Sequence, residues 1–163
     1  MTNTREMDDR ENAVWRGFVS ATQQLVSSLD KQLVQDAQLS GPEHAVLTAL
    51  AEHAEQSDTL VRARDLGLSL GWDRSRLSHL LKRMEARGLL ERTSCPSDAR
   101  GLDVQITADG LEAVQQASSG YTEFVRTHFF DVLTPEEQDA LASVSRKIKS
   151  TLEPQCDSEG PTS

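Results

Sequence analysis

The sequence predicts a mainly α-helical chain with one small β-hairpin, and three observations lead to this fold class. Four apolar residues recur at intervals of three and four within residues 77–84, which is the spacing of one helix face. Residues 102–106 alternate apolar and polar side chains, as a half-buried strand does. Residues 94–101, between this strand and another short one at 89–93, are rich in turn-forming types. A basic helix followed by such a hairpin indicates a winged helix-turn-helix.

The predicted helix before the hairpin has two opposed faces. Asp73 is its expected N-cap, because a carboxylate there can accept hydrogen bonds from the first backbone amides, and Gly88 is its expected end. Its apolar stripe faces the core. The opposite face is polar and basic, which suits contacts to DNA phosphates and base edges but also an ordinary solvated helix surface. We predict DNA contacts from Arg74, Ser75, Arg76, Ser78, His79, Lys82 and Arg83.

Two helices are predicted in the N-terminal part of the chain. We expect residues 1–11 to be frayed, because they are almost entirely polar. Residues 12–38 follow with a helix in which apolar side chains recur every three or four positions. Ser40, with proline two residues later, predicts the start of a second helix that reaches about Ala54.

The remaining elements of the helix-turn-helix and the C-terminal region follow in order. Residues 59–62 can add a third strand beside the hairpin, and residues 64–70 form the first helix of the motif, closed by Gly71. Thr107 caps a long helix to about residue 132. The sequence TPEE at 134–137 is a capping box with proline at the first helical position, so it starts a sixth helix. Residues 154–163 have a disordered composition.

The composition predicts one domain over residues 1–163 that pairs with a second copy of itself. Aromatic residues make up only 4% of the chain and hydrophobic residues 37%, so a partner subunit would complete a thin core. Residues 40–107 form the winged helix-turn-helix, whereas the helices of 12–38 and 108–153 carry more apolar surface than that module can bury. We predict an isologous homodimer, with Phe18, Leu25, Phe129, Leu141, Val144, Ile148 and Leu152 at its interface.

Positive charge is concentrated in the middle of an acidic chain. The formal net charge is -9, which by itself argues against binding to a polyanion. Between residues 62 and 100, however, nine basic residues face five acidic ones. The excess of positive charge is therefore confined to the segment that would face DNA, whereas the rest of the chain is net negative. No apolar run reaches membrane-spanning length, so we expect a cytoplasmic protein without a membrane partner.

Four short motifs carry a family resemblance. They are DRS at 73–75, GLLER at 88–92, DAR at 98–100 and ITADG at 106–110. In this order and spacing they resemble the MarR family of transcriptional regulators from about Leu39 to Leu111, with Ile106 in place of the usual leucine. The resemblance implies a homodimer that binds a pseudo-palindromic, double-stranded DNA operator, most often as a repressor.

The hairpin tip and a small-molecule site complete the predicted function. Arg100 would enter the minor groove, Asp98 would hold an arginine in place by a charge-assisted bond, and Ser97 lies beside them. The resemblance also implies a small anionic or phenolic effector between the dimerisation and DNA-binding parts, and the tryptophan at position 15 is similar in place to one in a urate-responsive branch. Residues predicted to line that site are Trp15, His44, Leu47, Trp72 and His128.

Two alternative functions remain open at this point. Cys95, near arginines in the hairpin turn, could make the protein a redox sensor, and the winged helix could instead bind a protein partner. Cys95 and Cys156 have no metal-ligand or disulfide spacing. The histidines are too far apart for a metal pattern, and catalytic or dinucleotide motifs are absent from the sequence. We therefore expect no enzyme activity, no cofactor and no metal.

Overall fold

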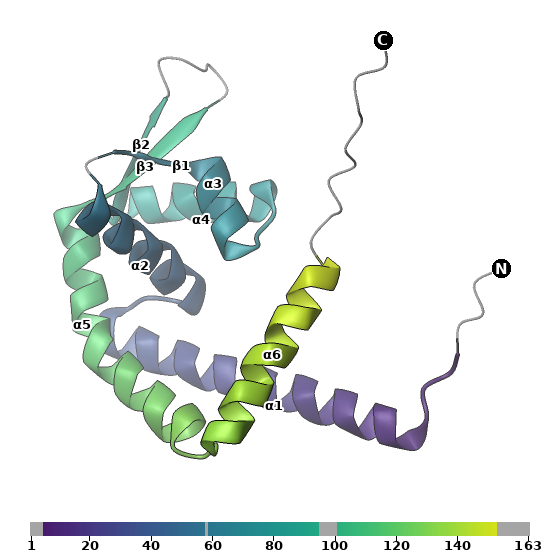
Figure 1. The fold of residues 1–163 in the computed structure, drawn as a ribbon. Coiled ribbons are helices and arrows are strands. Elements are labelled where there is room, and N and C mark those ends of the chain that lie inside the picture. The colour runs from purple at the N-terminus through teal and green to yellow at the C-terminus, as the bar shows by residue number, and fades with distance from the viewer. Residues whose placement is uncertain (1–4, 58, 95–100, 153–163) are drawn as a thin grey trace, which may run out of the picture. The chain divides into compact units, whose positions relative to one another are not determined.

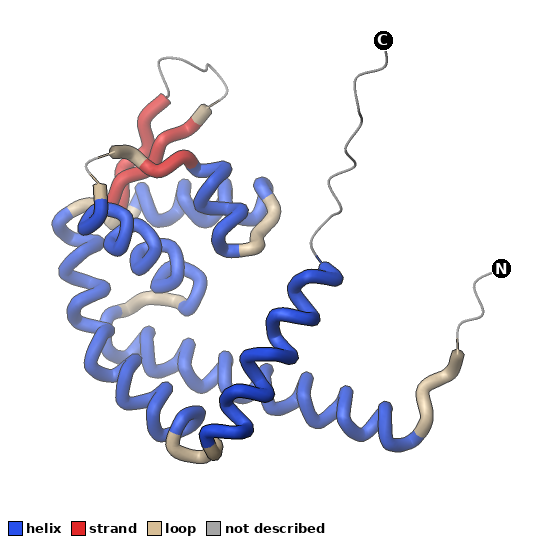
Figure 2. The backbone as a smooth tube through the Cα atoms, viewed as in Figure 1, coloured by secondary structure: helices blue, strands red, loops and turns tan. Residues whose placement is uncertain are grey.

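A computed structural model describes residues 5–57, 59–94 and 101–152. The chain divides into two compact units, Met1–Phe124 and Val125–Ser163, and each is described by itself. Within the described residues the structure has six α-helices, one π-helical turn and three strands (Figures 1 and 2). In chain order they are α1 (Asp9–Ala37), α2 (Gly41–Gln56), β1 (Val61–Arg62), α3 (Ala63–Leu70), α4 (Arg74–Ala86), β2 (Leu90–Ser94), β3 (Leu102–Ile106), α5 (Ala108–Val125), η1 (Arg126–Phe130) and α6 (Pro135–Leu152). The predicted fold class and its six helices are confirmed.

The strands form one antiparallel sheet in the order β1-β3-β2, close to α2, α3 and α4 in Figure 1. In β2 and β3, Leu90 lies opposite Ile106 and Ser94 opposite Leu102. Val61 of β1 lies opposite Val104, so the third strand that the sequence suggested is present. The three strands hold the hairpin against the helices, as a wing requires.

The core of the first unit lies where α2, α3, α4 and the sheet meet. The predicted apolar stripe of α4 is buried there, and the side chains of Leu81 and Met84 are fully enclosed. Side chains from the other elements complete the cluster, among them Val46, Leu47, Leu50, Leu66, Leu90 and Val104. Because this stripe faces inward, the opposite face of α4 must face solvent.

Local capping interactions start and stop these helices as predicted, with one exception. The carboxylate of Asp73 accepts from the backbone amide of Arg76 at 2.8 Å, and Gly71 ends α3 with a φ of +67°. Gly88, with a φ of +75°, follows α4. The prediction of a frayed start to about residue 11 is wrong, because Asp8 and Glu11 form a capping box that starts α1 at Asp9.

The helix after the wing is shorter than predicted. We expected it to continue to about residue 132, but α5 ends at Val125 and the π-helical turn η1 follows. The amide of Asp131 donates to the carbonyl oxygen of Arg126 at 2.8 Å, which is the five-residue spacing of a π-helix. Because this turn lies at the end of the helix, no later helical residues follow whose apolar periodicity would reveal the shift.

The motif at 106–110 joins the end of α4 to the start of α5. Thr107 donates its hydroxyl to the carbonyl oxygen of Gly88 at 2.6 Å and accepts from the amide of Gly110 at 3.1 Å. A Cβ atom at Gly110 would lie 2.0 Å from the carbonyl oxygen of Leu89. The backbone of Leu89, the residue just before β2, therefore approaches α5 at a distance that only glycine permits.

Substituting Gly110 by alanine should destabilise the fold. The added methyl group would force the Leu89 backbone away from α5, and overpacking of this kind lowers the free energy of unfolding by about 1–3 kcal/mol. Urea denaturation followed by circular dichroism would measure the change. Ser118→Ala, at an exposed position of the same helix, is the matched control and should change stability by less than about 0.5 kcal/mol. Equal stability of the two variants would contradict the packing argument.

Candidate nucleic-acid interface

The helix α4 presents a continuous polar face to solvent. All seven of the α4 residues for which DNA contacts were predicted are exposed, whereas the four residues of the predicted apolar stripe are buried. The exposed set is Arg74, Ser75, Arg76, Ser78, His79, Lys82 and Arg83. The structure thus separates the two faces as the spacing predicted, and DNA contact by these individual residues stays a prediction.

Arg76 is held by an aromatic ring that sequence reasoning had assigned elsewhere. Its guanidinium carbon lies 4.9 Å from the centre of the Trp72 ring, which is cation–π geometry. Trp72 is half-buried and packs against the core, so the ring is a fixed platform. Trp72 and Arg76 are four positions apart, a spacing that could have indicated a contact between their side chains. Because the N-cap Asp73 lies between them, Trp72 precedes the helix and the pair was not read as neighbours on one helix face.

Three arginines of the basic stretch serve internal ion pairs. Arg62 pairs with Asp103 at 3.2 Å, Arg87 with Glu43 at 2.9 Å, and the Nε of Arg92 donates to Glu85 at 2.9 Å. Two of these carboxylates, Glu43 and Asp103, lie outside the stretch that was counted, so including them halves the excess of positive charge from four to two. Charge counting along the sequence therefore overstated the cations that are available to DNA.

The predicted wing-tip contacts fall outside the described residues. The structure places the strand ends Ser94 and Leu102 opposite each other, which sets the base of the tip. Ser97, Asp98 and Arg100 lie outside the residues that the structure describes, and so do Cys95 and Cys156. The roles of Ser97, Asp98, Arg100 and Cys95 stay predictions.

The predicted effector residues have different surroundings in the structure. Trp15 lies in the first half of α1 and is 57% exposed, whereas Leu47 belongs to the buried core. His44 is buried and its ring stacks on that of Tyr121 in α5, with 4.7 Å between the ring centres and 25° between their planes. His128 lies in η1, in the second unit. A shared effector site formed by these residues with Trp72 stays a prediction.

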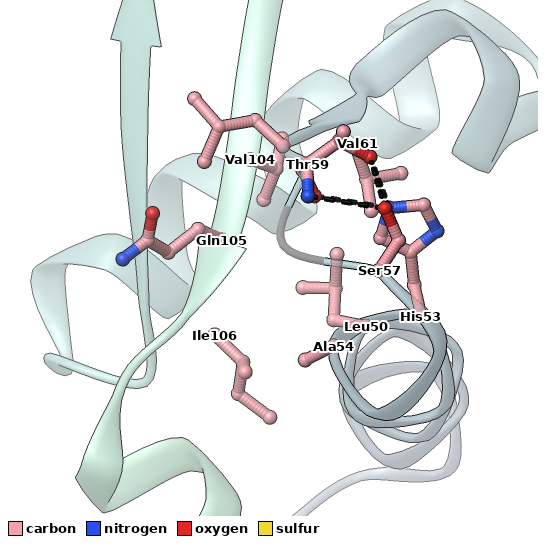
Figure 3. Close-up of a pocket in the computed structure, with 10 residues that line it drawn as sticks. Leu50, His53, Ala54, Ser57, Thr59, Val61, Val104, Gln105 and Ile106 are labelled. Carbon is pink, nitrogen blue, oxygen red and sulfur yellow. Dashed lines mark hydrogen bonds between the residues drawn. The ribbon is translucent and has the colours of Figure 1, made fainter.

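A hollow of about 210 Å³ lies between the C-terminal end of α2 and strands β1 and β3 (Figure 3). Three of its polar residues contact one another, because Nε2 of His53 lies 3.0 Å from the carbonyl oxygen of Thr59 and the hydroxyls of Ser57 and Thr59 are 2.8 Å apart. None of the predicted effector residues lines it. The lining residues are Leu50, His53, Ala54, Ser57, Thr59, Leu60, Val61, Val104, Gln105 and Ile106.

Acidification should destabilise the fold through His44. Burial lowers the pKa of His44 below its ordinary value of 6.5, so the unfolded chain takes up a proton more readily than the folded one. The stability that depends on the neutral imidazole is complete above pH 6.5 and is lost as the pH falls through the lower, folded value. In urea denaturation, we expect the loss of unfolding free energy from about pH 7 to about pH 5 to be smaller for His44→Phe.

The control for this prediction is His79→Gln, which removes an exposed histidine from α4. This variant should keep the pH dependence of the natural sequence. If His44→Phe kept it as well, the assignment of the pH effect to the buried ring would be wrong.

Within the described residues, no group of three or more potential ligands is placed to hold a metal ion. Among the same residues, every helix is too short or too polar to cross a membrane. The short helix α3 packs against the exposed basic helix α4, and the three-stranded wing lies beside them. This arrangement defines a winged helix-turn-helix protein of the DNA-binding class.

Comparison with known proteins identifies the family. The sequence profile of the MarR family matches residues 37–101. Sco3205, a MarR family transcriptional regulator from Streptomyces coelicolor solved in complex with DNA, is 34% identical, with a TM-score of 0.88 and 95% of each chain covered. AbsC, a MarR family transcriptional regulator from the same organism, is 32% identical, with a TM-score of 0.82 and coverage of 91% of this chain and 98% of AbsC.

A third relative is the transcriptional repressor MprA of Escherichia coli (strain K12), which is 25% identical over 113 residues. The match spans 69% of this chain and 64% of the length of MprA. The chain belongs to the MarR family and is a DNA-binding transcriptional regulator.

Proposed function

We propose that this chain is a homodimeric, ligand-responsive repressor that acts in the cytoplasm and inserts two α4 helices into the halves of a pseudo-palindromic operator. The observation that carries the proposal is the exposed polar face of α4, with Arg76 fixed over Trp72. Short side chains such as Ser75 and Ser78 can approach base edges, and the arginines and lysine can reach phosphates or guanine.

Exposed apolar side chains outside the DNA-binding elements support the dimer. Phe18 of α1 is 45% exposed, and none of the residues of α6 is buried. Val144, Ile148 and Leu152 of α6 are 44%, 42% and 75% exposed, although their spacing makes one continuous seam. A second copy of the chain would cover such surfaces in an isologous interface. We assign this role to residues 12–38 and 108–153, and DNA binding to residues 40–107.

The proposed dimer would repress by occupying the operator, and a ligand would release it by changing the dimer's geometry. MprA is a repressor, and occupation of an operator by a dimer of this kind would exclude other proteins from the same DNA. A small anionic or phenolic effector could favour a separation of the two recognition helices that does not fit B-DNA. A hundredfold loss of operator affinity requires a coupling free energy of only about 2.7 kcal/mol, which one bound ligand can supply.

Selection of bound fragments from random double-stranded DNA would test the proposal. We expect two inverted half-sites whose centres lie about 10 base pairs apart, because two-fold related helices meet successive major grooves about 34 Å apart. Sedimentation of the protein should give a dimer. Selection of single, unpaired half-sites, or binding that does not weaken with salt, would contradict the proposal and favour a protein-interaction module instead.

A further inference from the structure

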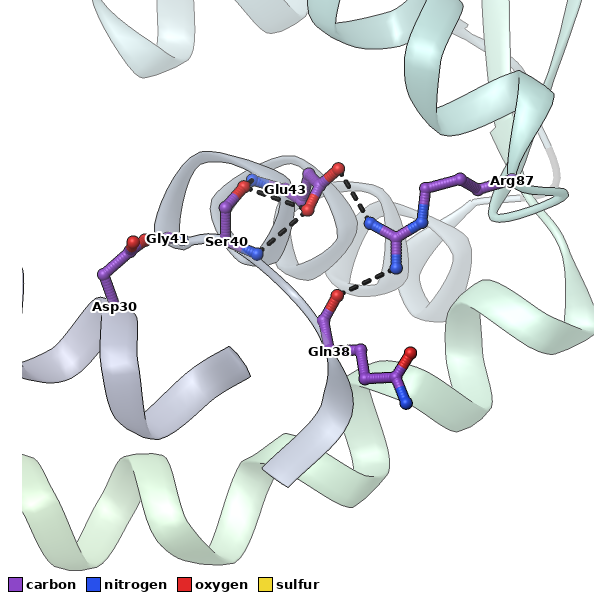
Figure 4. Close-up of polar contacts among 6 residues, drawn as sticks. All are labelled: Asp30, Gln38, Ser40, Gly41, Glu43 and Arg87. Atoms are coloured by element: carbon purple, nitrogen blue, oxygen red, sulfur yellow. Dashed lines mark hydrogen bonds and ion pairs between the residues drawn. The ribbon is translucent and has the colours of Figure 1, made fainter. Parts of the chain in front are cut away.

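One guanidinium group joins the recognition helix to both sides of the α1–α2 junction (Figure 4). Arg87 is the C-cap residue of α4. Its Nη1 donates to Oε1 of Glu43 at 2.9 Å, and its Nη2 donates to the carbonyl oxygen of Gln38 at 2.8 Å. Gln38 caps the end of α1 and Glu43 lies in the first turn of α2, so Arg87 connects three helices.

The junction that Arg87 contacts is itself held in one conformation. Gln38 has a φ of +55°, a left-handed conformation that non-glycine residues seldom adopt, and its amide donates to α1. The side chain of Asp30 in α1 accepts from the amide of Gly41 at the start of α2. Leu39 between them is fully buried. The end of α1 and the start of α2 are both fixed to this turn. A side chain that binds the turn therefore also constrains the orientation of α1.

Glu43 is a buried charge with a full set of donors. Its side chain is only 8% exposed, and its Oε2 accepts from the amide and the hydroxyl of Ser40, both at 2.9 Å. Burial raises the pKa of Glu43, but the bonds from Ser40 and the charge of Arg87 outweigh burial and hold the pKa below its ordinary value. The carboxylate is therefore ionised at neutral pH, and removing Arg87 would leave a buried charge without its counter-ion.

We propose that Arg87 is a positioning residue that, through Glu43 and Gln38, fixes the angle between α1 and the recognition helix α4, and thereby sets the half-site spacing that the dimer accepts. This inference rests on the proposed function, in which α1 belongs to the dimerisation region. The 13 residues of α4 make it about 20 Å long. A tilt of about 10° at the Arg87 end would move the opposite, N-terminal end by about 3.5 Å, one base-pair step.

The test compares operator spacing in variants of this contact. The variants are Arg87→Met, Arg87→Lys, Glu43→Gln and the double variant of Arg87→Met with Glu43→Gln. Each is titrated against the selected operator, against the same operator with one base pair inserted or removed between the half-sites, and against a single half-site. Circular dichroism and sedimentation establish that each variant is folded and dimeric.

We expect the natural protein to discriminate strongly between spacings, and the variants to lose about tenfold in affinity for the correct spacing while losing much less for the altered ones. Binding to a single half-site should not change. The double variant should be no weaker than Arg87→Met alone, because the two substitutions break the same contact. Arg87→Lys should fall between the natural protein and Arg87→Met, since one ammonium group cannot reproduce both contacts of the guanidinium fork.

Arg62→Met is the matched control. It also removes an arginine from a pair with a buried carboxylate, Asp103, but that pair joins β1 to β3 and does not reach α1. Spacing discrimination should therefore stay as in the natural protein. If Arg87→Met should fail to fold, Glu43→Gln and Arg87→Lys carry the same comparison, because both retain a polar side chain of similar size.

Three results would overturn the inference, and they differ from a failure of the proposed function. Unchanged spacing discrimination in Glu43→Gln and Arg87→Lys would show that the contact does not set the spacing. An equal loss for all duplexes and the single half-site in Arg87→Met, with no loss in Glu43→Gln, would show that Arg87 contacts phosphate directly. If Arg62→Met lost spacing discrimination to the same extent, the loss would be assigned to a general loss of rigidity in the fold and not to the Arg87 contact. If the natural protein itself showed no spacing preference, the proposed function would fail first.

Discussion

Replacing Ile148 of α6 by glutamate should convert the protein into a monomer and lower its operator affinity at least a hundredfold. Ile148 is 42% exposed in the single chain and lies in the apolar seam of a helix that has no buried residue. A carboxylate there would have to be desolvated in the predicted interface, which costs several kcal/mol without a partner. Once the subunits separate, each recognition helix binds alone, and linked binding typically contributes about 10²–10⁴ in affinity.

Sedimentation and gel-shift titration would measure these two consequences separately. Ser150→Glu is the matched control, because it adds the same charge to α6 two residues away, roughly on the opposite side of the helix. The control should remain dimeric and bind the operator normally. A dimeric Ile148→Glu protein with unchanged affinity would remove α6 from the interface.

Arg76→Ala should weaken operator binding about tenfold or more without changing dimerisation or stability appreciably. The side chain is exposed and pre-positioned over Trp72, so it reaches DNA with little further ordering. Removing one arginine from a base or phosphate costs about 1–3 kcal/mol, and the dimer carries two copies. If Arg76 binds phosphate, the salt dependence of binding should also become shallower by about one unit for each phosphate that the variant no longer neutralises.

Fluorescence anisotropy at several salt concentrations would check this result. Lys31→Ala, which removes an exposed cation from α1, should leave the affinity within about twofold. Trp72→Leu should weaken binding in the same direction as Arg76→Ala but by less, since the arginine would remain without its platform. Arg100→Ala, at the predicted wing tip, should likewise weaken binding. Unchanged affinity of Arg76→Ala would remove α4 as the DNA-reading element.

Much of the fold could be predicted because its signals are local. The apolar stripe of α4, its cap at Asp73 and the alternation in β3 each depend on residues within a few positions of one another. For the same reason the exposed face of α4 could be assigned from the spacing of its residues alone. The start of α1 was missed although its capping box is also local, because a polar N-terminus is expected to fray.

Other features were beyond prediction from local pattern. Arg87 and Glu43 are 44 residues apart in sequence, and nothing near either one singles out the other among many cations and carboxylates. Gly110 lies in a family motif, but the motif does not say why glycine is needed. Glycine is needed because the Leu89 backbone lies too close for a Cβ atom, and this distance depends on how the chain before β2 packs against α5. The π-helical turn at η1 likewise follows from backbone hydrogen bonding that side-chain periodicity does not encode.

The sequence by itself determined the order of helices and strands, the two faces of α4 and membership of the winged-helix class, since these depend on spacing, capping and turn chemistry over short segments. Only the tertiary structure decided which arginines are committed to internal pairs, which one rests on an aromatic ring and which one ties the recognition helix to α1. The physical reason is that the strength of a charge pair depends on distance and burial in three dimensions, and chain folding sets both quantities.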